Sequence, residues 1–96
     1  MIRVKVHTIL GLKEIIGQRE IEISVPEQSN LSDVLSHMVE TWGEKLSSRL
    51  FEPGTDQVSS HIRLMVNGRD MAFLNGMETV IQDGDEIFLF PPAFGG

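Results

Sequence analysis

The sequence predicts an α+β roll, in which one main helix packs on a mixed sheet of four to five strands. Three observations predict it. Two stretches near the amino terminus alternate apolar and polar residues, as half-buried strands do. A single longer stretch carries apolar residues at helical spacing. Further alternating stretches, separated by turn signals, follow that helix, and one helix against one sheet is an α+β arrangement.

The first two strands are expected to pair as an antiparallel hairpin. Residues 2–8 alternate apolar and polar side chains, and residues 20–25 repeat the pattern. The segment 10–17 between them is too long for a tight turn. It is expected to hold a helical turn that ends at Gly17, because glycine readily adopts the left-handed conformation that closes a helix.

The main helix is predicted over 31–42. Asn30 suits the N-cap position, and Asp33 places an acid in the first turn, where the helix dipole favours it. Gly43 is expected to close the helix, and residues 45–51 to add a short second one. The apolar residues of the main helix form one stripe that should face the sheet: Leu31, Val34, Leu35, Met38 and Trp42.

The second half of the chain is predicted to add strands joined by turns. Residues 52–60 form a polar loop. Asn67-Gly68 favours a type I′ hairpin turn because both residues tolerate positive φ, and Asp83-Gly84 is expected to form a second turn of that kind. The predicted strands are 62–66, a short return strand over 69–74, and 85–90.

Composition excludes several classes of function. The chain has 96 residues and no cysteine, which excludes disulfides, thiolate zinc sites and cysteine-bound iron–sulfur clusters. Fourteen acidic residues against eight basic ones give a formal charge of −6, which argues against nucleic-acid binding. No run could cross a membrane, and the alternating amino terminus does not resemble a signal peptide. We therefore expect one cytoplasmic domain over 1–96.

The end of the sequence carries the chemistry. Two prolines cannot continue a sheet, so a flexible tail is expected over about 91–96. Glycine has no Cβ, so Gly95 and Gly96 could thread a narrow channel into a partner's active site. The Gly96 carboxylate could there be adenylated with ATP. Attack by a sulfur nucleophile would then give a thiocarboxylate, and attack by a lysine amine would give an isopeptide.

Aromatic residues gather near this tail. Phe88 and Phe90 share one face of the last predicted strand, and its other face is apolar too. This pattern fits a central strand covered on both faces, or a strand with one face that docks a partner. Docking is the favoured interpretation for Phe90 and Phe94, with Pro91 and Pro92 beside them. For Phe88 the sequence does not decide between the two interpretations.

Other candidate sites are weaker. The sequence offers no convincing nucleophile, base or metal constellation, so no catalytic residue, no metal and no permanently bound cofactor are expected; ATP would be consumed by the activating partner. The histidines are predicted to be solvated surface residues, and the acidic cluster near the last strand to be a charged turn without the spaced ligands of a calcium loop. These residues are His7, His37 and His61, and Asp83, Asp85 and Glu86.

Three motifs resemble the MoaD branch of the MoaD/ThiS sulfur carriers. They are Val66-Asn67-Gly68-Arg69-Asp70, Asp83-Gly84-Asp85-Glu86-Ile87 and Phe90-Pro91-Pro92-Ala93-Phe94-Gly95-Gly96. The resemblance implies a ubiquitin-like β-grasp fold, in which the last strand lies parallel to the first in mid-sheet. It also implies activation by a ubiquitin-activating-like adenylyltransferase (MoeB-like). Sulfur would pass to a molybdopterin precursor in a complex with the large, MoaE-like subunit of molybdopterin synthase.

Two features depart from that pattern. Phe94 is bulkier than expected before the glycines, and the 52–60 loop is longer than in compact members of the family. Both resemble longer MoaD-like forms, some of which serve tungsten enzymes or act as small archaeal modifiers. Two rival functions therefore stay open. One is a protein modifier that forms isopeptide bonds through Gly96, and the other is a β-grasp interaction domain with an inert tail.

Overall fold

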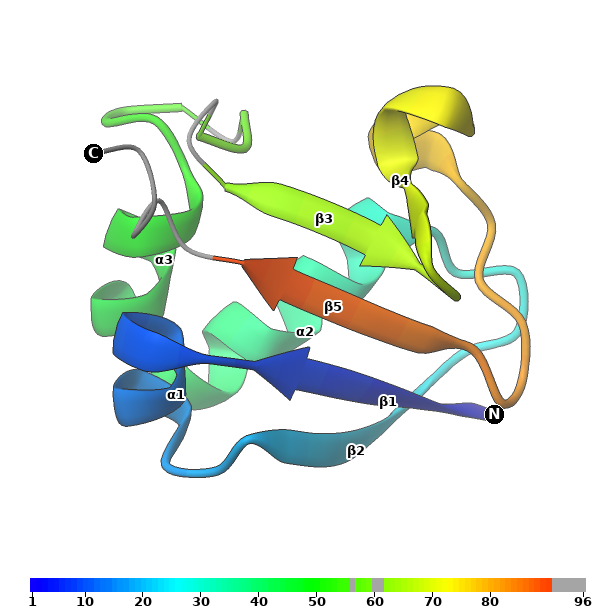
Figure 1. Cartoon of the computed structure of the whole chain (residues 1–96), viewed down its shortest axis with the longest axis horizontal. Coiled ribbons are helices and arrows are strands. Elements are labelled where there is room, and N and C mark those ends of the chain that lie inside the picture. Colours follow the sequence, from blue (N-terminus) through cyan, green and yellow to red (C-terminus); the bar gives the residue numbers. More distant parts are fainter. Residues whose placement is uncertain (56, 60–61, 91–96) are drawn as a thin grey trace.

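The computed structural model describes residues 1–55, 57–59 and 62–90. In these residues a five-stranded sheet forms one layer, and helices lie behind it (Figure 1). The elements in chain order are β1 (Ile2–Thr8), α1 (Leu10–Ile16), β2 (Glu20–Val25), α2 (Leu31–Trp42), α3 (Glu44–Leu50), β3 (Arg63–Val66), β4 (Arg69–Asp70), the 3-10 turns η1 (Met71–Phe73) and η2 (Gly76–Glu78), and β5 (Glu86–Phe90).

The last strand of the chain lies in the middle of the sheet. The strand order is β2-β1-β5-β3-β4. β1 pairs antiparallel with β2 and parallel with β5, and β3 pairs antiparallel with both β5 and β4. The mixed sheet and the central, parallel position of β5 confirm the α+β class and the β-grasp arrangement that the resemblance implied.

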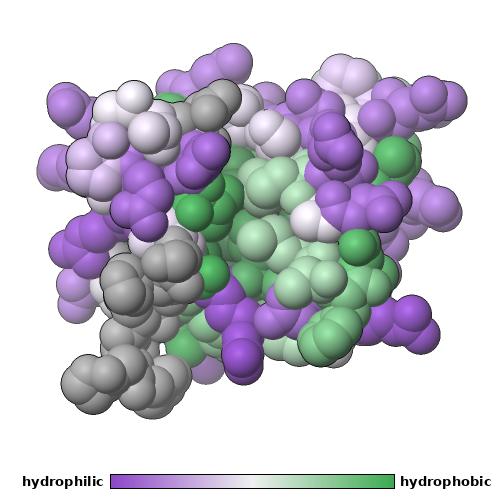
Figure 2. Space-filling model, turned by 90° about the horizontal axis from the view of Figure 1, so that it is seen from above, coloured by the Kyte–Doolittle hydropathy of each residue, from purple (hydrophilic) through white to green (hydrophobic). Residues whose placement is uncertain are grey.

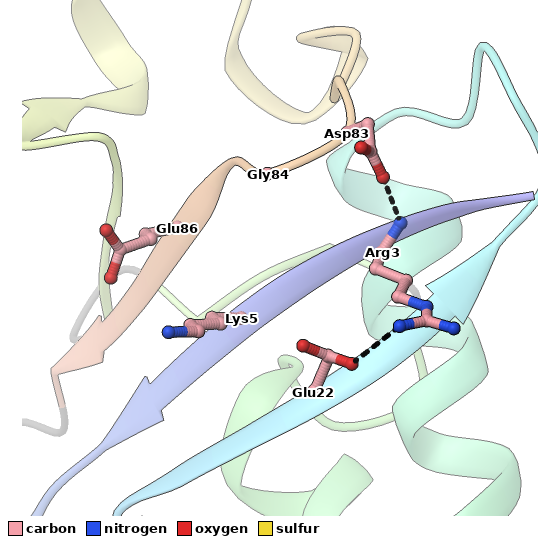
Figure 3. A pocket seen from close by; sticks show the side chains of 6 residues that line it. All are labelled: Arg3, Lys5, Glu22, Asp83, Gly84 and Glu86. Atoms are coloured by element: carbon pink, nitrogen blue, oxygen red, sulfur yellow. Dashed lines mark hydrogen bonds and ion pairs between the residues drawn. The ribbon is translucent and has the colours of Figure 1, made fainter.

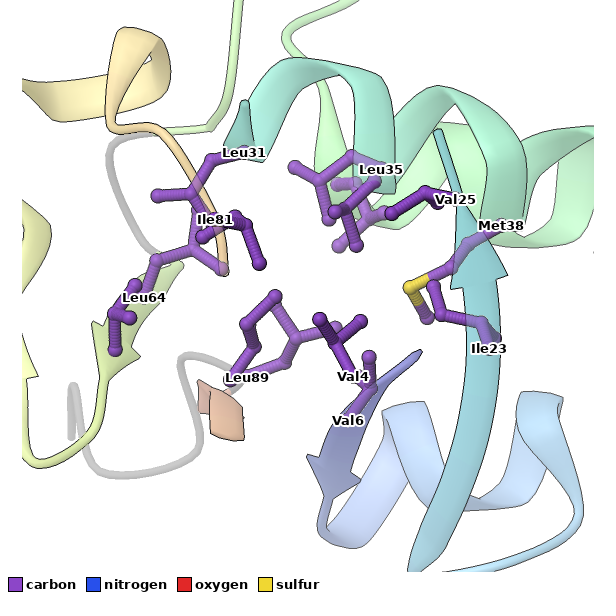
Figure 4. Packing of buried hydrophobic residues seen from close by; sticks show 14 of the residues in the cluster. Val4, Val6, Ile23, Val25, Leu31, Leu35, Met38, Leu64, Ile81 and Leu89 are labelled. Carbon is purple, nitrogen blue, oxygen red and sulfur yellow. The ribbon is translucent and has the colours of Figure 1, made fainter. Parts of the chain in front are cut away.

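Period-two alternation decides which face of each strand is buried. In β1 the residues Val4 and Val6 are buried, whereas Arg3 and Lys5 between them are exposed. The apolar stripe of α2 meets this face of the sheet (Figure 4). The core that results includes Val4, Val6, Ile23, Val25, Leu31, Leu35, Met38, Leu64, Ile81 and Leu89.

The boundaries of α2 are fixed by the residues that the sequence indicated. The Asn30 side chain accepts a hydrogen bond from the Asp33 amide at 2.9 Å, and the Asp33 carboxylate accepts one from the Asn30 amide at 2.9 Å. This reciprocal pair is a capping box, which satisfies two amides that lack partners within the helix. Gly43 ends the helix. Trp42, the last residue of the predicted stripe, is half-buried, whereas Leu35 is fully buried.

The turns are partly as predicted. Asn67 (φ 51°) and Gly68 (φ 85°) both have positive φ, which confirms the predicted turn between β3 and β4. At the second predicted turn only Gly84 (φ 88°) has positive φ, so the assignment of a second type I′ turn at Asp83 was wrong. That turn connects a loop to the central strand β5 and does not connect two strands of a hairpin.

The return strand was predicted too long. It covers Arg69–Asp70 only, and the chain then enters η1. The physical reason is local: the Asp70 side chain accepts a hydrogen bond from the Ala72 amide at 2.9 Å, which turns the backbone away from the sheet. The last strand begins at Glu86, one residue later than predicted. The second helix, α3, begins and ends one residue earlier than predicted. None of the helices in the described ranges has the length and apolar character needed to cross a membrane.

Candidate functional site

The sheet has one face that the helices leave open. The helices lie behind the sheet in Figure 1, and no helix of the described residues covers its front. In β5, Ile87 and Leu89 are buried toward the helices, whereas Phe88 and Phe90 on the opposite face are half-buried. Of the two interpretations left open for Phe88, a strand with one open face is therefore the one that the structure supports.

One row of side chains crosses the open face from edge to edge. Glu20 of β2 is paired with His7 of β1, and His7 with Phe88 of β5. Phe88 is paired with Met65 of β3, and Met65 with Asp70 of β4. The centre of the row is aromatic and apolar, and both ends carry carboxylates. We call His7, Phe88, Phe90 and Met65 the docking face.

His7 is the polar residue that organises this face. Its Nε2 lies 2.8 Å from Glu86 Oε1, and its Nδ1 lies 3.5 Å from Glu20 Oε1. Its ring stacks on Phe88 with centroids 4.3 Å apart and an interplanar angle of 9°. The prediction that His7 is a solvated surface residue was wrong, because strand pairing brings a carboxylate from each neighbouring strand beside it.

The other histidines add no site. His37 is half-buried on α2, and His61 lies outside the described residues. Within the part of the chain that the structure describes, no three His, Asp or Glu side chains are placed to hold a metal ion.

Phe90 continues the aromatic row to the end of β5. Its ring stacks on that of Phe88 with centroids 6.3 Å apart and an interplanar angle of 8°. Such offset pairs add about 0.5–1.5 kcal/mol beyond the burial of their area. Of the predicted site residues, Phe90 lies on the docking face, and its side chain is half-buried. The others lie outside the described residues: Pro91, Pro92, Phe94, Gly95 and Gly96.

The two internal motifs of the sequence meet at the start of β5. The Asn67 side chain donates to Asp85 Oδ1 at 2.9 Å and accepts from the Glu86 amide at 2.9 Å. Asp85 Oδ2 also accepts from the Gln82 amide at 2.8 Å. The acids of this turn are thus engaged in holding β5 between its neighbours, in agreement with the interpretation as a charged turn.

A shallow depression of about 190 Å³ lies beside this turn (Figure 3). Asp83 Oδ1 accepts from the Arg3 amide at 2.8 Å, and the Arg3 guanidinium lies 3.9 Å from the Glu22 carboxylate. Acidic and basic groups alternate around the depression, and exposed pairs of this kind contribute at most about 1 kcal/mol each. The lining residues are Arg3, Lys5, Glu22, Asp83, Gly84 and Glu86. Their mixed charge argues against an anion site here.

Sequence reasoning missed half of the docking face. His7 and Met65 were placed on strands, but their neighbours depend on the strand order, which the pattern alone does not give. The signal was present in two places: His7 and Met65 each stand on the polar side of an alternating strand. Met65 there is apolar where a polar residue is usual, and that exception marks a position that water does not fully reach.

Comparison with known proteins gives a consistent result. Residues 11–96 match the model of the ThiS family. The chain is 37% identical over 84 residues to small archaeal modifier protein 3 of Haloferax volcanii, with 88% of each chain covered. It is 28% identical over 81 residues to the sulfur carrier protein CysO of Mycobacterium tuberculosis, with 83% of each covered. The solution structure of small archaeal modifier protein 1 from Methanosarcina acetivorans superposes with a TM-score of 0.84 at 30% identity, covering 100% of this chain and 98% of that one.

Proposed function

The chain belongs to the ThiS family of ubiquitin-like sulfur carriers, and from that premise we propose that it carries sulfur as a thiocarboxylate on Gly96. We propose further that the sulfur serves the biosynthesis of molybdopterin, the organic part of the molybdenum and tungsten cofactors. The observation that carries the proposal is the family match, which extends through the Gly95-Gly96 pair to residue 96.

The chemistry needs no catalytic group in this chain. In the proposed first step, a Gly96 carboxylate oxygen attacks the α-phosphorus of ATP, and pyrophosphate leaves. In the second, a hydrosulfide ion attacks the carbonyl carbon of the acyl adenylate, AMP leaves with the bonding electron pair, and loss of the sulfur proton gives the thiocarboxylate. A partner adenylyltransferase, MoeB-like in the resemblance, would supply the catalysis. This chain would supply the acyl group and a surface for recognition.

The docking face supports this division of labour. Aromatic side chains that stay half-exposed on a sheet face are typical of surfaces that a partner covers. Phe90 is the last residue of β5, and Pro91 follows it in the sequence. A partner that contacts Phe90 therefore binds at the residue after which the tail begins. The same face could serve in turn the adenylyltransferase and a MoaE-like large subunit.

A second function is favoured by a specific observation. The 37% identical relative is described as a modifier, so the same activated carboxylate could instead be attacked by a lysine amine of a target protein. Both functions use the same tail and the same adenylation. They differ only in the nucleophile that takes the acyl group.

Intact-protein mass spectrometry of the chain from its native host separates these functions. A sulfur carrier gives a species in which one terminal oxygen is replaced by sulfur, with the chain ending at Gly96. A modifier gives covalent adducts with a Gly96–lysine link. Transfer of sulfur from the thiocarboxylate to a molybdopterin precursor, in the presence of the large subunit, then tests the proposed pathway. A free carboxylate as the only form in the cell would favour the inert tail.

Substitution of Gly95 tests the tail directly. Gly95→Val adds a branched side chain where the tail must pass a narrow channel, so it should abolish ATP–pyrophosphate exchange by the cognate adenylyltransferase. Unfolding free energy should change by well under ~1 kcal/mol. A control is Thr41→Val, which places a branched apolar side chain at an exposed position of α2 and should leave exchange intact. Wild-type exchange with Gly95→Val would show that the terminal carboxylate is not the working group.

A further inference from the structure

Phe73 is an apolar side chain that the fold leaves in solvent. It is 87% exposed, more than any other large apolar residue in the described ranges. Figure 2 looks onto this edge of the molecule, over β3, β4 and the 3-10 turns, and shows apolar residues gathered in its middle with polar residues around them. The docking face proposed above does not include Phe73, so its exposure needs a separate explanation.

The turn that carries Phe73 is held in place. Met71 and Leu74, on either side, pack against the core. The Asp70 carboxylate accepts from the Ala72 amide at 2.9 Å, and the Leu74 amide donates to the Met71 carbonyl at 2.9 Å. Phe73 is thus presented outward by a turn that is anchored on both sides. A group that is already fixed loses less conformational entropy when a ligand binds to it.

A depression lies next to Phe73. Its volume is about 390 Å³, and its lining residues are Arg63, Met65, Gly68, Arg69, Asp70 and Phe73. We call it the Phe73 depression. Met65, half-buried, supplies apolar surface, and Gly68 has no side chain to narrow the space. Met65 also belongs to the docking face, where it is paired with Phe88, so the depression and the docking face share this residue.

The charges around the Phe73 depression are unlike those of the chain as a whole. The chain has a formal charge of −6, yet two of its eight basic residues, Arg63 and Arg69, line this depression. Its single carboxylate, Asp70, is already engaged: Oδ2 lies 3.4 Å from Arg63 Nε, and Oδ1 accepts from the Ala72 amide. Within the described residues Arg69 has no ion-pair partner. The depression is therefore basic, with one guanidinium available.

We propose that the Phe73 depression binds an acidic peptide segment of a partner protein. An apolar side chain of the segment would lie against Phe73 and Met65, and a neighbouring Asp or Glu would accept hydrogen bonds from Arg69. Screening in physiological salt limits charge effects to about 8–10 Å, so a ligand in the depression is affected more by these arginines than by acidic residues farther away. A second copy of the chain is a poorer occupant, because two molecules of charge −6 repel each other. The proposal does not rest on the chemistry of the tail.

A phage-displayed library of random short peptides, selected on the full chain, tests the proposal. Enriched peptides should carry Asp or Glu next to Leu, Ile or Phe. Fluorescence anisotropy with the synthesised peptides should show affinity falling by at least about tenfold in Phe73→Ser and in Arg69→Glu. Two matched controls should bind like the wild type: Val80→Ser, at an exposed apolar residue outside the depression, and Arg19→Glu, at an exposed arginine between α1 and β2.

Several results would overturn the proposal. They are the absence of enriched peptides, enrichment of basic or uncharged ones, and binding that survives Phe73→Ser. Sedimentation equilibrium tests whether a second copy of the chain occupies the surface. A dimer that Phe73→Ser abolishes would assign the surface to that second copy. Phe73 is 87% exposed, so its substitution should leave the circular dichroism spectrum and melting temperature unchanged, and lost binding then reports on the surface.

Discussion

The apolar side chains on the two faces of β5 differ in how far they are buried. Ile87 and Leu89 are at most 1% exposed under the helices, whereas their neighbours Phe88 and Phe90 keep part of their rings in water on the open face. Internal packing specifies the first pair. Internal packing does not account for Phe88 and Phe90, because each Å² of apolar surface left in water loses about 25 cal/mol of the stabilisation that burial would give. The contrast indicates that the covered face holds the fold together, and it fits the proposal that a partner covers the open face.

The largest effect should come from the covered face. Leu35→Ala removes a fully buried side chain of α2 and leaves a cavity, so the unfolding free energy should fall by about 2–5 kcal/mol in a denaturant titration. Ser36→Ala, at the exposed neighbouring position, is the control and should change it by less than about 0.5 kcal/mol. A loss below half a kilocalorie for Leu35→Ala would mean that the covered face is not the core.

Phe90→Ala should separate the two faces. Affinity for the adenylyltransferase, measured by calorimetry, should fall at least about tenfold, which is ~1.4 kcal/mol. The unfolding free energy should fall by roughly 1 kcal/mol, because the residue is only half-buried and its ring stacks on Phe88. Unchanged affinity with a large drop in stability would instead make Phe90 a core residue, and the contrast between the faces would disappear.

The capping box gives a smaller effect on the covered side. Asn30→Ala removes the side-chain oxygen that accepts from the Asp33 amide, so stability should fall by about 1 kcal/mol. Binding to the adenylyltransferase should be unaffected, since α2 lies behind the sheet (Figure 1). Asn30→Ser, which restores a capping oxygen, is the matched control and should recover most of the loss. Equal stability of the alanine and serine variants would show that the cap is not needed.

The exposed ion pairs of the open face should matter least. The guanidinium of Arg3 and the carboxylate of Glu22 are 3.9 Å apart, with side chains 74% and 54% exposed. Glu22→Gln should therefore change the unfolding free energy by less than about 0.5 kcal/mol in low salt, and by nothing measurable in high salt. A loss above 1 kcal/mol would show that charge pairing on the open face contributes to the fold.

Local signals in the sequence were sufficient where the interaction itself is local. The Asn30 cap and the positive φ of Asn67 and Gly68 depend on residues at most three positions apart, and they were predicted correctly. The strand predicted through Leu74 failed because residues 71–74 are apolar, as strand residues often are, but the Asp70 side chain captures the Ala72 amide. Periodicity records which side chains are apolar and does not record a competing hydrogen bond of this kind.

The candidate site needed information that the sequence does not display. His7 and Glu86 are 79 positions apart and meet only because β1 and β5 run parallel. Phe90 could be placed from its position before two prolines. The partners of His7 and the exposure of Phe73 could not, because both depend on which strands are neighbours and where the 3-10 turns leave the sheet.

The central position of β5 has a consequence for synthesis of the protein. β5 is made after the other four strands, yet it joins the β1–β2 pair to the β3–β4 pair. Neither pair has another strand of the described sheet at its inner edge. A chain still growing on the ribosome therefore has two unpaired strand edges and an incomplete core, and it depends on long-range pairing that forms slowly. A product that stops before β5 has no folded docking face to offer. Recognition of the folded sheet would thus let an activating partner ignore unfinished chains.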